Sequence, residues 1–444
     1  MKKFIITLVS FFTIFAGTAH AGLKADISNV INTSGINRGS ISISVKNANT
    51  GKSVYELNPR TPISPASTQK ILTATTAFMT LGDDYKFSTK LYRNSNNEYT
   101  LKLGADPYLT SKDLDKIVKF IPKEQNAVNI DATIIDDNEW GEGWQWDDDL
   151  NPLMPKFSAY NLDKNLMEIT ISPGMRGYPA EITQNVEYPI TYINKTVTDK
   201  VTKYTIKRQN QISPDILLID GKIQYDKSAI VNIPINNPKK YFKMRLSEAI
   251  INQGISCSGI YKDVKVKDND KLISLLSHSI STAKKDIYKN SNNMVSETVF
   301  KIAGGVKSNC TGSFKNGLEM FNQFCREHSL DTTGIKLVDA SGVSKNNLMT
   351  ADFMTEFLLK VQGYLEPELP TAGEGTLSNR MLYLKGFIHA KTGTLNNISA
   401  IAGYITTKKN QRYTFCIMIN NPEVSPGNKK MFEEYILRTI YTKG

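Results

Sequence analysis

The pattern of apolar and polar residues changes twice along the chain. Residues 41–57, ISISVKNANTGKSVYEL, alternate around an Asn-Thr-Gly turn and predict a hairpin, and residues 64–82 predict a helix that ends at a glycine. From about residue 85 to 265, short β-branched runs alternate with Asn, Asp, Gly and Pro turns, which is typical of a mostly β region. Helical periodicity returns beyond residue 270, followed by two apolar strands and a last amphipathic helix.

The middle region is itself divided. Residues 108–122 and 241–254 have helical periodicity and bracket a more β-like stretch from 161 to 225. A chain of 444 residues also exceeds what one core usually holds. These patterns predict a multi-domain α/β protein, with a main domain of antiparallel sheet and helices interrupted by a nested, mostly β insertion. The expected divisions are residues 22–84 with 265–444, residues 85–160 with 226–264, and residues 161–225.

The first residues form a separate segment. Two lysines, an apolar run and the small-residue pattern Ala19-His20-Ala21 give residues 1–21 the layout of a secretory signal peptide. An uncleaved N-terminal anchor is the alternative. The apolar run is shorter than the about 20 residues of a membrane span, and no later segment is long and apolar enough to span. We therefore expect an exported, periplasmic protein that starts at Gly22 and has no transmembrane segment in its mature form.

The net charge narrows the range of partners only slightly. It is +11 for the whole sequence and +9 without Lys2 and Lys3, an excess that could favour an anionic surface such as the cell wall or a membrane face. No block of basic residues and no basic motif interleaved with aromatic residues indicates nucleic-acid binding. We therefore expect no nucleic-acid partner.

The cysteines and histidines do not indicate a metal site. The four cysteines match no zinc-site spacing, and the three mature histidines are scattered, so we expect neither a metal nor a cofactor. Four cysteines permit three pairings, and the sequence does not choose among them. Cys310 and Cys325 could close a short loop, whereas Cys416 lies in an apolar strand pattern typical of a buried free thiol. The fourth is Cys257.

A candidate nucleophile opens the first predicted helix. In SPASTQK, Ser67 stands three residues before Lys70, so both side chains lie on one helix face. A lysine can act as the base that activates a serine if it is uncharged, and burial or a second cation lowers its pKa. The same spacing recurs at Ser281 and Lys284, which we interpret as a solvated helix face.

Two further motifs supply the other groups that such a serine needs. Lys391-Thr392-Gly393 lies in a strand pattern with small neighbours, where Lys391 is the candidate second cation and binding group for a substrate carboxylate. In the sequence Asn-Ser-Asn-Asn between two helical patterns, Ser291 could relay a proton and Asn293 could bind substrate. Each motif alone matches a surface turn. Together, in this order, they form the set used by penicillin-binding proteins and serine β-lactamases.

With these motifs the chain resembles the penicillin-binding protein 4 family of D-Ala-D-Ala carboxypeptidases and endopeptidases. SPASTQK, KNSNNM and HAKTGTL carry the resemblance, together with VDASGVSKNNLMT and LPTAGEGTLSNRM. The resemblance implies a transpeptidase-like domain of the penicillin-binding and serine β-lactamase fold, interrupted by a second domain that is interrupted by a third. By position it implies acylation of Ser67, Lys70 as its base, and an oxyanion hole of the backbone amides of Ser67 and Thr394.

The resemblance also implies a reaction and its partners. Ser67 would attack the carbonyl of the penultimate D-Ala of a peptidoglycan stem peptide, the terminal D-Ala or a cross-linking amine would leave, and water would hydrolyse the acyl-enzyme. β-Lactam antibiotics would acylate Ser67 and leave slowly, as inhibitors. The sequence does not decide between carboxypeptidase and endopeptidase preference, nor whether the protein forms a homo-oligomer.

The chain departs from the family's pattern in DDNEWGEGWQWDDD, which holds all three tryptophans. In the family this region of the second domain reaches the cleft and carries an acid that binds the amino group of the diamino acid in the stem. The loop before GEGW is shorter here, which leaves the acid open among four carboxylates, with Trp140 beside them as a substrate contact. The carboxylates are Asp136, Asp137, Glu139 and Glu142. The alternative is that the tryptophans pin the insertion against the main domain.

Two rival hypotheses come from other classes of protein. A serine β-lactamase is disfavoured by the long insertion and by the lack of an evident deacylating glutamate in a matching motif. A non-catalytic cell-wall binding protein is disfavoured because the residues of all three motifs are intact. Ser341 and Gly342 are expected to form either the far wall of the cleft or a tight turn. His389, on the same strand face as Lys391, is expected to be structural.

Overall fold

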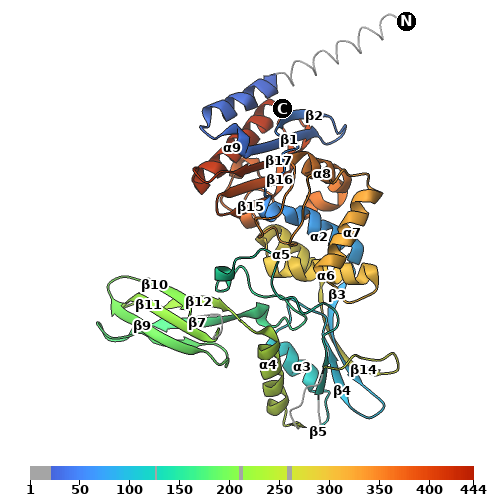
Figure 1. Cartoon of the computed structure of the whole chain (residues 1–444), viewed down its shortest axis with the longest axis vertical. Helices are drawn as coiled ribbons and strands as arrows, with labels where there is room; N and C mark the ends of the chain where they lie inside the picture. Colours follow the sequence, from blue (N-terminus) through green and yellow to red (C-terminus); the bar gives the residue numbers. More distant parts are fainter. Residues whose placement is uncertain (1–21, 126–127, 210–213, 258–262) are drawn as a thin grey trace, which may run out of the picture.

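The computed structural model describes residues 22–125, 128–209, 214–257 and 263–444 (Figure 1). The predicted signal peptide lies outside these residues. Within them, no helix has both the length and the apolar character that crossing a membrane requires.

A five-stranded antiparallel sheet joins the two ends of the described chain. Its strand order is β15-β16-β17-β1-β2, and the early strand β1 pairs with the late strand β17 so that Ile41 lies opposite Ile419. The hairpin and the two late apolar strands predicted from the sequence are therefore parts of one sheet. The strands are β1 (Ile41–Asn47), β2 (Ser53–Leu57), β15 (Ile388–Leu395), β16 (Ile398–Thr406) and β17 (Arg412–Asn420).

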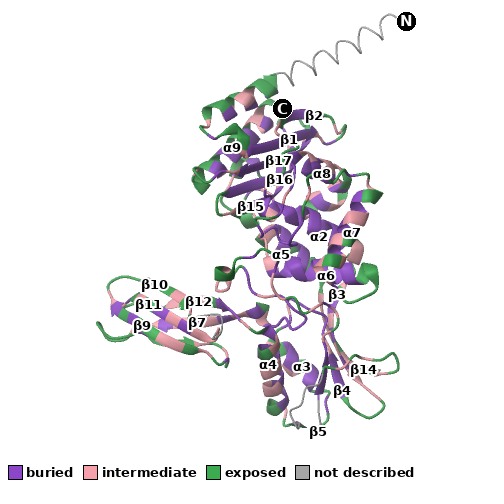
Figure 2. Ribbon diagram, in the orientation of Figure 1, coloured by how far each residue is buried: buried purple, intermediate pink, exposed green. Residues whose placement is uncertain are grey.

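Both faces of this sheet are covered, which explains why its strands are apolar at successive positions. On one face lie a helix at residues 22–33, which the sequence analysis did not predict, and α9 (Pro426–Lys443). The other face packs on α8 (Ala351–Leu365), where the Tyr404 hydroxyl donates to the Leu358 carbonyl oxygen at 2.8 Å. Figure 2 shows the resulting band of buried strands between helices with exposed outer faces.

A group of helices beside the sheet carries the first two motifs. At its centre is α2 (Lys70–Leu81), buried at every position from Lys70 to Phe78. The predicted helix over residues 64–82 begins as a 3₁₀ turn, η2 (Ala66–Gln69), before it becomes α-helical. The neighbours of α2 are α5 (Ile280–Asn290), α6 (Asn293–Ser308) and α7 (Phe314–Glu327).

The insertion begins with a four-stranded sheet of order β14-β3-β4-β6. The last of these strands in the sequence, β14 (Lys271–Ser279), pairs with β3 (Lys86–Arg93). The boundary expected after residue 264 therefore lies too early, because β14 still belongs to the inserted sheet. The helical pattern expected beyond residue 270 starts only at Ile280, because the preceding apolar run pairs with β3. The other elements are β4 (Tyr99–Lys102), β6 (Val128–Asp131), α3 (Ser111–Val118), α4 (Pro238–Asn252), β5 (Glu124–Gln125) and β13 (Ser256–Cys257).

The nested region forms an arm that projects sideways in Figure 1. It holds two three-stranded sheets, of order β10-β11-β9 and β12-β7-β8. Because β12 pairs with β7, the nested strands run past residue 225, where the sequence placed their end. The strands are β7 (Leu166–Ser172), β8 (Glu181–Gln184), β9 (Thr191–Asp199), β10 (Lys203–Arg208), β11 (Ile216–Gln224) and β12 (Ala229–Pro234).

The cysteines with described side chains are free thiols. Cys310 is exposed, whereas Cys325 and Cys416 are buried, so the loop suggested for Cys310 and Cys325 is wrong. Burial raises the pKa of the Cys325 thiol to about 12, which leaves it unreactive at neutral pH. The side chain of Cys257 lies outside the described part.

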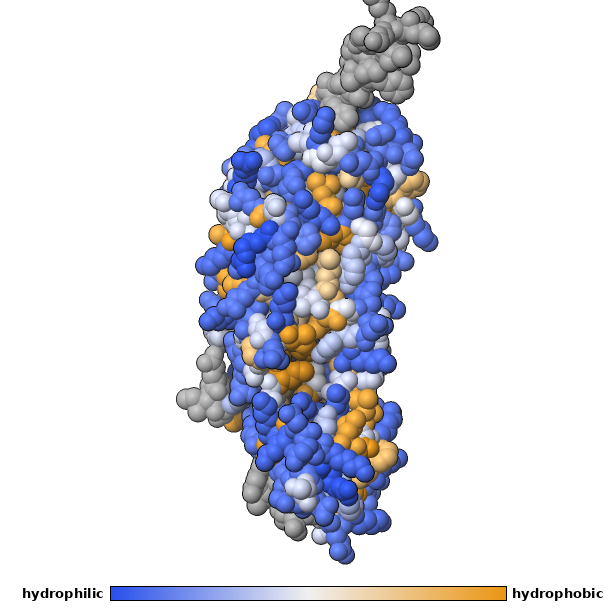
Figure 3. Space-filling model, turned by 90° about the vertical axis from the view of Figure 1, so that its right-hand side faces the viewer, coloured by the Kyte–Doolittle hydropathy of each residue, from blue (hydrophilic) through white to orange (hydrophobic). Residues whose placement is uncertain are grey.

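The face in Figure 3 is mainly hydrophilic, with apolar patches over its middle and lower part.

Candidate active site

Ser67 lies on a strained turn immediately before α2. Ala66 has a left-handed backbone, with φ of 48°, and is completely buried, whereas Ser67 keeps part of its surface exposed. A left-handed residue with a side chain costs roughly 1–2 kcal/mol, so packing must hold the turn in place. Gly342 supplies part of that packing, because a Cβ at this glycine would overlap the Ala66 carbonyl oxygen. Strain of this kind often marks a functional site.

Lys70 reaches Ser67 as the spacing predicted. Its Nζ donates to the Ser67 Oγ at 3.0 Å, to the Asn293 Oδ1 at 2.7 Å and to the Ser341 carbonyl oxygen at 2.6 Å. Burial lowers the pKa of Lys70 to about 7, although nearby Asp339 and Glu297 raise it. Burial, rather than the expected second cation, is therefore the main reason that the amine can act as a base near neutral pH.

The second motif connects α5 and α6 and faces both lysines. Ser291 caps α5 in a left-handed conformation with φ of 63°, which turns its hydroxyl toward the third motif. There the Lys391 Nζ donates to the Ser291 Oγ at 2.8 Å. Asn293 starts α6, and its Nδ2 donates to the Leu153 carbonyl oxygen at 2.9 Å, so the amide spans Lys70 and the insertion. The three motifs are thus linked by side-chain hydrogen bonds.

The third motif lies on β15, the edge strand of the central sheet. Lys391 is completely buried, and burial together with the charge of Lys70 holds its pKa well below the usual value. Gly393 is required here, since a Cβ would lie 2.9 Å from both the Pro65 carbonyl oxygen and the Ser67 nitrogen. The strand can therefore lie directly against the turn at Ala66 and Ser67.

Two buried carboxylates that the sequence analysis missed, Glu297 and Asp339, lie near Lys70 and hold the turn at Ser341 and Gly342. Glu297 accepts the amide N–H of Ser341 at 2.8 Å, one turn of α6 beyond Asn293. Asp339 accepts the amide N–H of Gly342 at 2.7 Å and the indole N–H of Trp144 at 2.8 Å. Their only signal in the sequence was proximity, since Glu297 follows the second motif by four residues and Asp339 precedes Ser341 by two.

These contacts decide between the alternatives left open for two segments. Trp144 is nearly buried and joins the insertion to the main domain through Asp339, as the pinning alternative predicted, whereas Trp146 is 73% exposed. Ser341 and Gly342 form a tight turn and a wall of the site at once, since Lys70 bonds the Ser341 carbonyl oxygen.

A cavity of about 1040 Å³ opens beside these motifs. Ser67, Ser291, Asn293, Thr392 and Thr394 all border it. Its opposite side comes from the insertion, including Trp144, Asp148, Leu153 and Lys164. The cleft is therefore shared between the main domain and the insertion.

The carboxylates expected from the tryptophan-rich segment do not border this cleft. Asp136 instead accepts an ion pair from Lys301 at 2.6 Å, and Trp140 packs edge-on against Trp144 with ring centres 4.9 Å apart. The acid of this segment that borders the cleft is Asp148, whose pKa is raised by partial burial and by Asp147. Asp137, Glu139 and Glu142 are absent from the lining too, because the chain turns back between Gly141 and Trp144.

Two other expected residues have structural roles. Lys284 is not on a solvated face: it is buried and pairs with Asp83 at 2.7 Å, while Ser281 bonds Ser279 at the exposed start of α5. The repeated spacing is therefore unrelated to the site. His389 is half-buried on β15, and its Nδ1 lies 3.5 Å from the Leu369 carbonyl oxygen.

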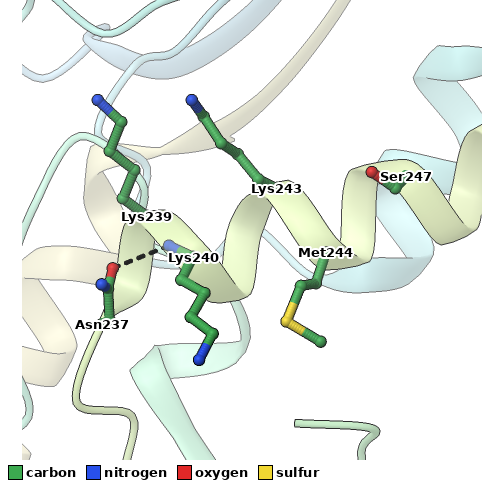
Figure 4. A pocket seen from close by; sticks show the side chains of 6 residues that line it. All are labelled: Asn237, Lys239, Lys240, Lys243, Met244 and Ser247. Carbon is green, nitrogen blue, oxygen red and sulfur yellow. Dashed lines mark hydrogen bonds between the residues drawn. The ribbon is translucent and has the colours of Figure 1, made fainter. Parts of the chain in front are cut away.

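A second pocket, of about 430 Å³, lies along α4 (Figure 4). Lys239 and Lys243 point the same way and face the same carboxylate, Asp263, at 3.0 and 4.0 Å, while Lys240 pairs with Asp215. The dashed bond is the helix cap, in which the Lys240 amide donates to Asn237. These three lysines therefore pair with only two carboxylates of the protein itself, because Lys239 and Lys243 share Asp263.

Comparison with known proteins agrees with this arrangement. The family model described as the D-Ala-D-Ala carboxypeptidase 3 (S13) family matches residues 23–438. A D-alanyl-D-alanine carboxypeptidase of an Actinomadura species is 24% identical over 88% of this chain and 79% of its own length. The D-alanyl-D-alanine carboxypeptidase DacB of Haemophilus influenzae is 23% identical over 84% of each chain.

The solved structures show the same fold. The crystal structure of penicillin binding protein 4 from Haemophilus influenzae superposes with a TM-score of 0.81, at 20% identity, covering 94% of this chain and 99% of that one. A second structure of that protein, complexed with a β-lactam, gives a TM-score of 0.78 at 19% identity. The penicillin-binding fold expected from the sequence is confirmed.

Proposed function

The chain belongs to the D-Ala-D-Ala carboxypeptidase 3 (S13) family, and from this premise we propose that it is a serine hydrolase that cleaves D-Ala-D-Ala termini of peptidoglycan stem peptides through an acyl-Ser67 intermediate. The observation that carries the proposal is the 3.0 Å contact between Ser67 and a buried Lys70 with a pKa of about 7. A lysine in this state is a free base in a large fraction of molecules at neutral pH, so it can accept the serine proton.

In the acylation step Lys70 takes the hydroxyl proton while the Ser67 Oγ forms a bond to the carbonyl carbon of the penultimate D-Ala. The negative charge on the carbonyl oxygen would be stabilised by the backbone amides of Ser67 and Thr394, which both border the cleft. As the C–N bond breaks, the amine of the terminal D-Ala takes up a proton. Ser291, bonded to Lys391 at 2.8 Å, provides a hydroxyl to relay that proton from Lys70.

In the second step water attacks the acyl-serine ester, and Lys70 accepts its proton and returns one to the Ser67 Oγ. Asn293 lies where it can bind the peptide group of the substrate, because its side chain borders the cleft and bonds Lys70. The ammonium form of Lys391, with the Thr392 and Thr394 hydroxyls beside it, would receive the terminal carboxylate. A β-lactam would form the same ester and leave slowly.

The size of the cleft supports activity on larger substrates than a stem peptide with a free D-Ala-D-Ala terminus. It is bordered on two sides and exceeds 1000 Å³, large enough for the second stem peptide of a cross-link, so we include endopeptidase activity on D-Ala-diamino acid cross-links. For the diamino acid's amino group, Asp148 replaces the four carboxylates first considered, because it borders the cleft and they do not. Export to the periplasm by residues 1–21 remains part of the proposal, as does the division into three domains.

The test is covalent labelling with a fluorescent penicillin. We expect a labelled band on a denaturing gel for residues 22–444 and for the matched control Ser281→Ala, and no band for Ser67→Ala. Retention of label on Ser67→Ala would reject the assigned nucleophile. Rapid consumption of penicillin without label would support a β-lactamase. No label with intact drug would support a non-catalytic binding protein. Cross-linked and uncross-linked muropeptides would then separate the two peptidase activities.

A further inference from the structure

The far end of the nested arm brings together three turns that are distant in the sequence. We call this end the distal tip and define it as residues 173–178, 197–203 and 222–228. β9 and β11 are parallel, with Gln224 opposite Asp199, so the turns that follow them lie at the same end of the sheet. The Gly177 amide donates to the Thr198 carbonyl oxygen at 2.9 Å and joins the third turn to them.

The distal tip exposes large apolar side chains. Met175 is 74% exposed, Tyr178 61% and Tyr225 55%. Val201, on the turn between β9 and β10, is 53% exposed. Each of the three turns thus contributes at least one apolar side chain to the same end of the arm. The three-stranded sheets cannot bury these side chains, because they stand beyond the last paired residues of the strands.

The distal tip is also basic, although the arm as a whole is close to neutral. Residues 161–235 hold nine Lys and Arg against eight Asp and Glu, but the tip holds five basic residues and only two acids. The excess positive charge is therefore concentrated at the outer end, and the inner end is acidic. The tip's basic residues are Arg176, Lys200, Lys203, Lys222 and Lys227, and its acids are Asp199 and Asp226. Lys222 pairs with Asp199 at 2.6 Å, so the net positive charge of the tip comes from the other basic residues.

We propose that the distal tip binds the surface of an anionic membrane, with Met175, Tyr178 and Tyr225 in the interface and the basic side chains at the headgroups. A lipid interface accepts apolar side chains from separate turns without a complementary groove, and it favours tyrosine, whose ring is apolar and whose hydroxyl is polar. Basic side chains add attraction to anionic headgroups. The two contributions together are what reversible membrane attachment requires.

If the distal tip binds a membrane, the arm would keep the rest of the molecule, including the cleft, at a distance from the membrane surface. In Figure 1 the arm leaves the side of the molecule, and its outer end is the part farthest from the body in that direction. The inference does not depend on Ser67 chemistry, since no residue of the distal tip borders the catalytic cleft.

The test is co-sedimentation of residues 22–444 with vesicles. Removing residues 1–21 prevents their apolar run from binding lipid by itself. We expect binding to vesicles that contain phosphatidylglycerol, weakening with added salt, and much weaker binding to vesicles of phosphatidylcholine alone. The triple variant Met175→Ser, Tyr178→Ser, Tyr225→Ser should bind at least tenfold more weakly. Lys200→Gln with Lys203→Gln should lose about fivefold for each charge on anionic vesicles.

A matched control removes exposed apolar side chains elsewhere. Phe120 and Ile251 are 56% and 71% exposed on the second domain, and Phe120→Ser with Ile251→Ser should leave vesicle binding unchanged. Every variant should still be labelled by fluorescent penicillin at the wild-type rate, which shows that it is folded. Equal vesicle binding by the triple variant and wild type would overturn the proposal. Binding of wild type to isolated peptidoglycan but not to vesicles would also overturn it, in favour of a polysaccharide partner.

Discussion

The side chains of Glu297 and Lys70 both form hydrogen bonds with the backbone of one residue, Ser341. The Glu297 carboxylate accepts its amide N–H at 2.8 Å, and the Lys70 Nζ donates to its carbonyl oxygen at 2.6 Å. Both side chains are buried, and the carboxylate raises the pKa of Lys70 against the burial that lowers it to about 7. A residue that does not contact the nucleophile therefore helps to determine how much of Lys70 is uncharged.

Replacing this carboxylate should shift the pH dependence of acylation. In the wild type we expect the rate of penicillin acylation to rise as the pH increases through about 7, because Lys70 must lose its proton to act as a base. Burial raises the pKa of Glu297 itself to about 7, so its negative charge acts on Lys70 mainly in the upper part of the neutral pH range. Glu297→Gln keeps an acceptor for the Ser341 amide and removes that charge, so the pKa of Lys70 falls further. The rising limb should move to lower pH. Acylation rates measured across the neutral range would show it.

The matched control is Glu319→Gln, which removes an exposed carboxylate from α7. Its pH profile should coincide with that of the wild type. A profile of Glu297→Gln that stays in place, or moves to higher pH, would contradict the role assigned to this carboxylate.

Gly393→Ala should remove most of the acylation rate without unfolding the protein. The new Cβ would lie 2.9 Å from the Ser67 nitrogen and 3.0 Å from the Ala66 Cβ, so β15 and the turn at Ala66 and Ser67 must move apart. A displacement of about 1 Å near reacting groups costs roughly 100-fold in rate. Gly363→Ala on α8, where an added Cβ meets nothing within 4 Å, should acylate normally. Equal rates for both variants would show that the close approach is not needed.

Asp148→Asn should weaken the recognition of a free amine next to the scissile bond. A hydrogen-bonded charge contributes about 1.5 kcal/mol or more, so we expect kcat/KM to fall about tenfold for a peptide with a free side-chain amine before D-Ala-D-Ala. The same peptide with an acetylated amine should be hydrolysed equally by wild type and variant. Asp137→Asn, an exposed residue outside the cleft, should have no effect on either peptide. A fall with Asp137→Asn alone would return the role to Asp137, one of the four carboxylates first considered.

Lys164→Gly should make the protein more stable. Asp163, Lys164 and Asn165 all have left-handed backbones, and Lys164, with φ of 60°, is the one with an exposed side chain. Relief of this strain outweighs the added freedom of glycine in the unfolded chain by about 0.5–1 kcal/mol. The midpoint of thermal unfolding should rise by about 1–3 °C. Lys164→Ala keeps the strain and should show no increase, so an equal rise in both variants would point to the lost charge instead.

The sequence predicted the parts of the site that depend on short spacing. Ser67 and Lys70 are three residues apart, and their contact follows from helix geometry alone. The positions of Glu297 and Asp339 beside Lys70 depend on how α6 and the turn at Ser341 and Gly342 pack on α2. No local sequence pattern encodes this packing. Asp148 was missed for a similar reason, because the turn between Gly141 and Trp144 determines which acid faces the cleft.

Apart from the helix at residues 22–33, the predicted fold failed where a strand's partner is distant in the sequence. The run from Lys271 to Ser279 looks like the start of a helical region, but its partner β3 lies almost two hundred residues earlier. β12 was placed outside the nested region because its pairing with β7 also spans a long loop. In both cases the tertiary partner overrode the local pattern. The hairpin of β1 and β2 needed no such partner and was predicted correctly.

The pairing of β1 with β17 means that the central sheet can be completed only when nearly the whole chain is present. Ser67 is made early on the ribosome, but β1 cannot begin to pair with β17 until Tyr413 has been added, and β15 precedes β17 with only β16 between them. Contacts between such distant segments form slowly, and the early hairpin must wait for them. A chain that stops short of β17 therefore has a nucleophile but no assembled cleft.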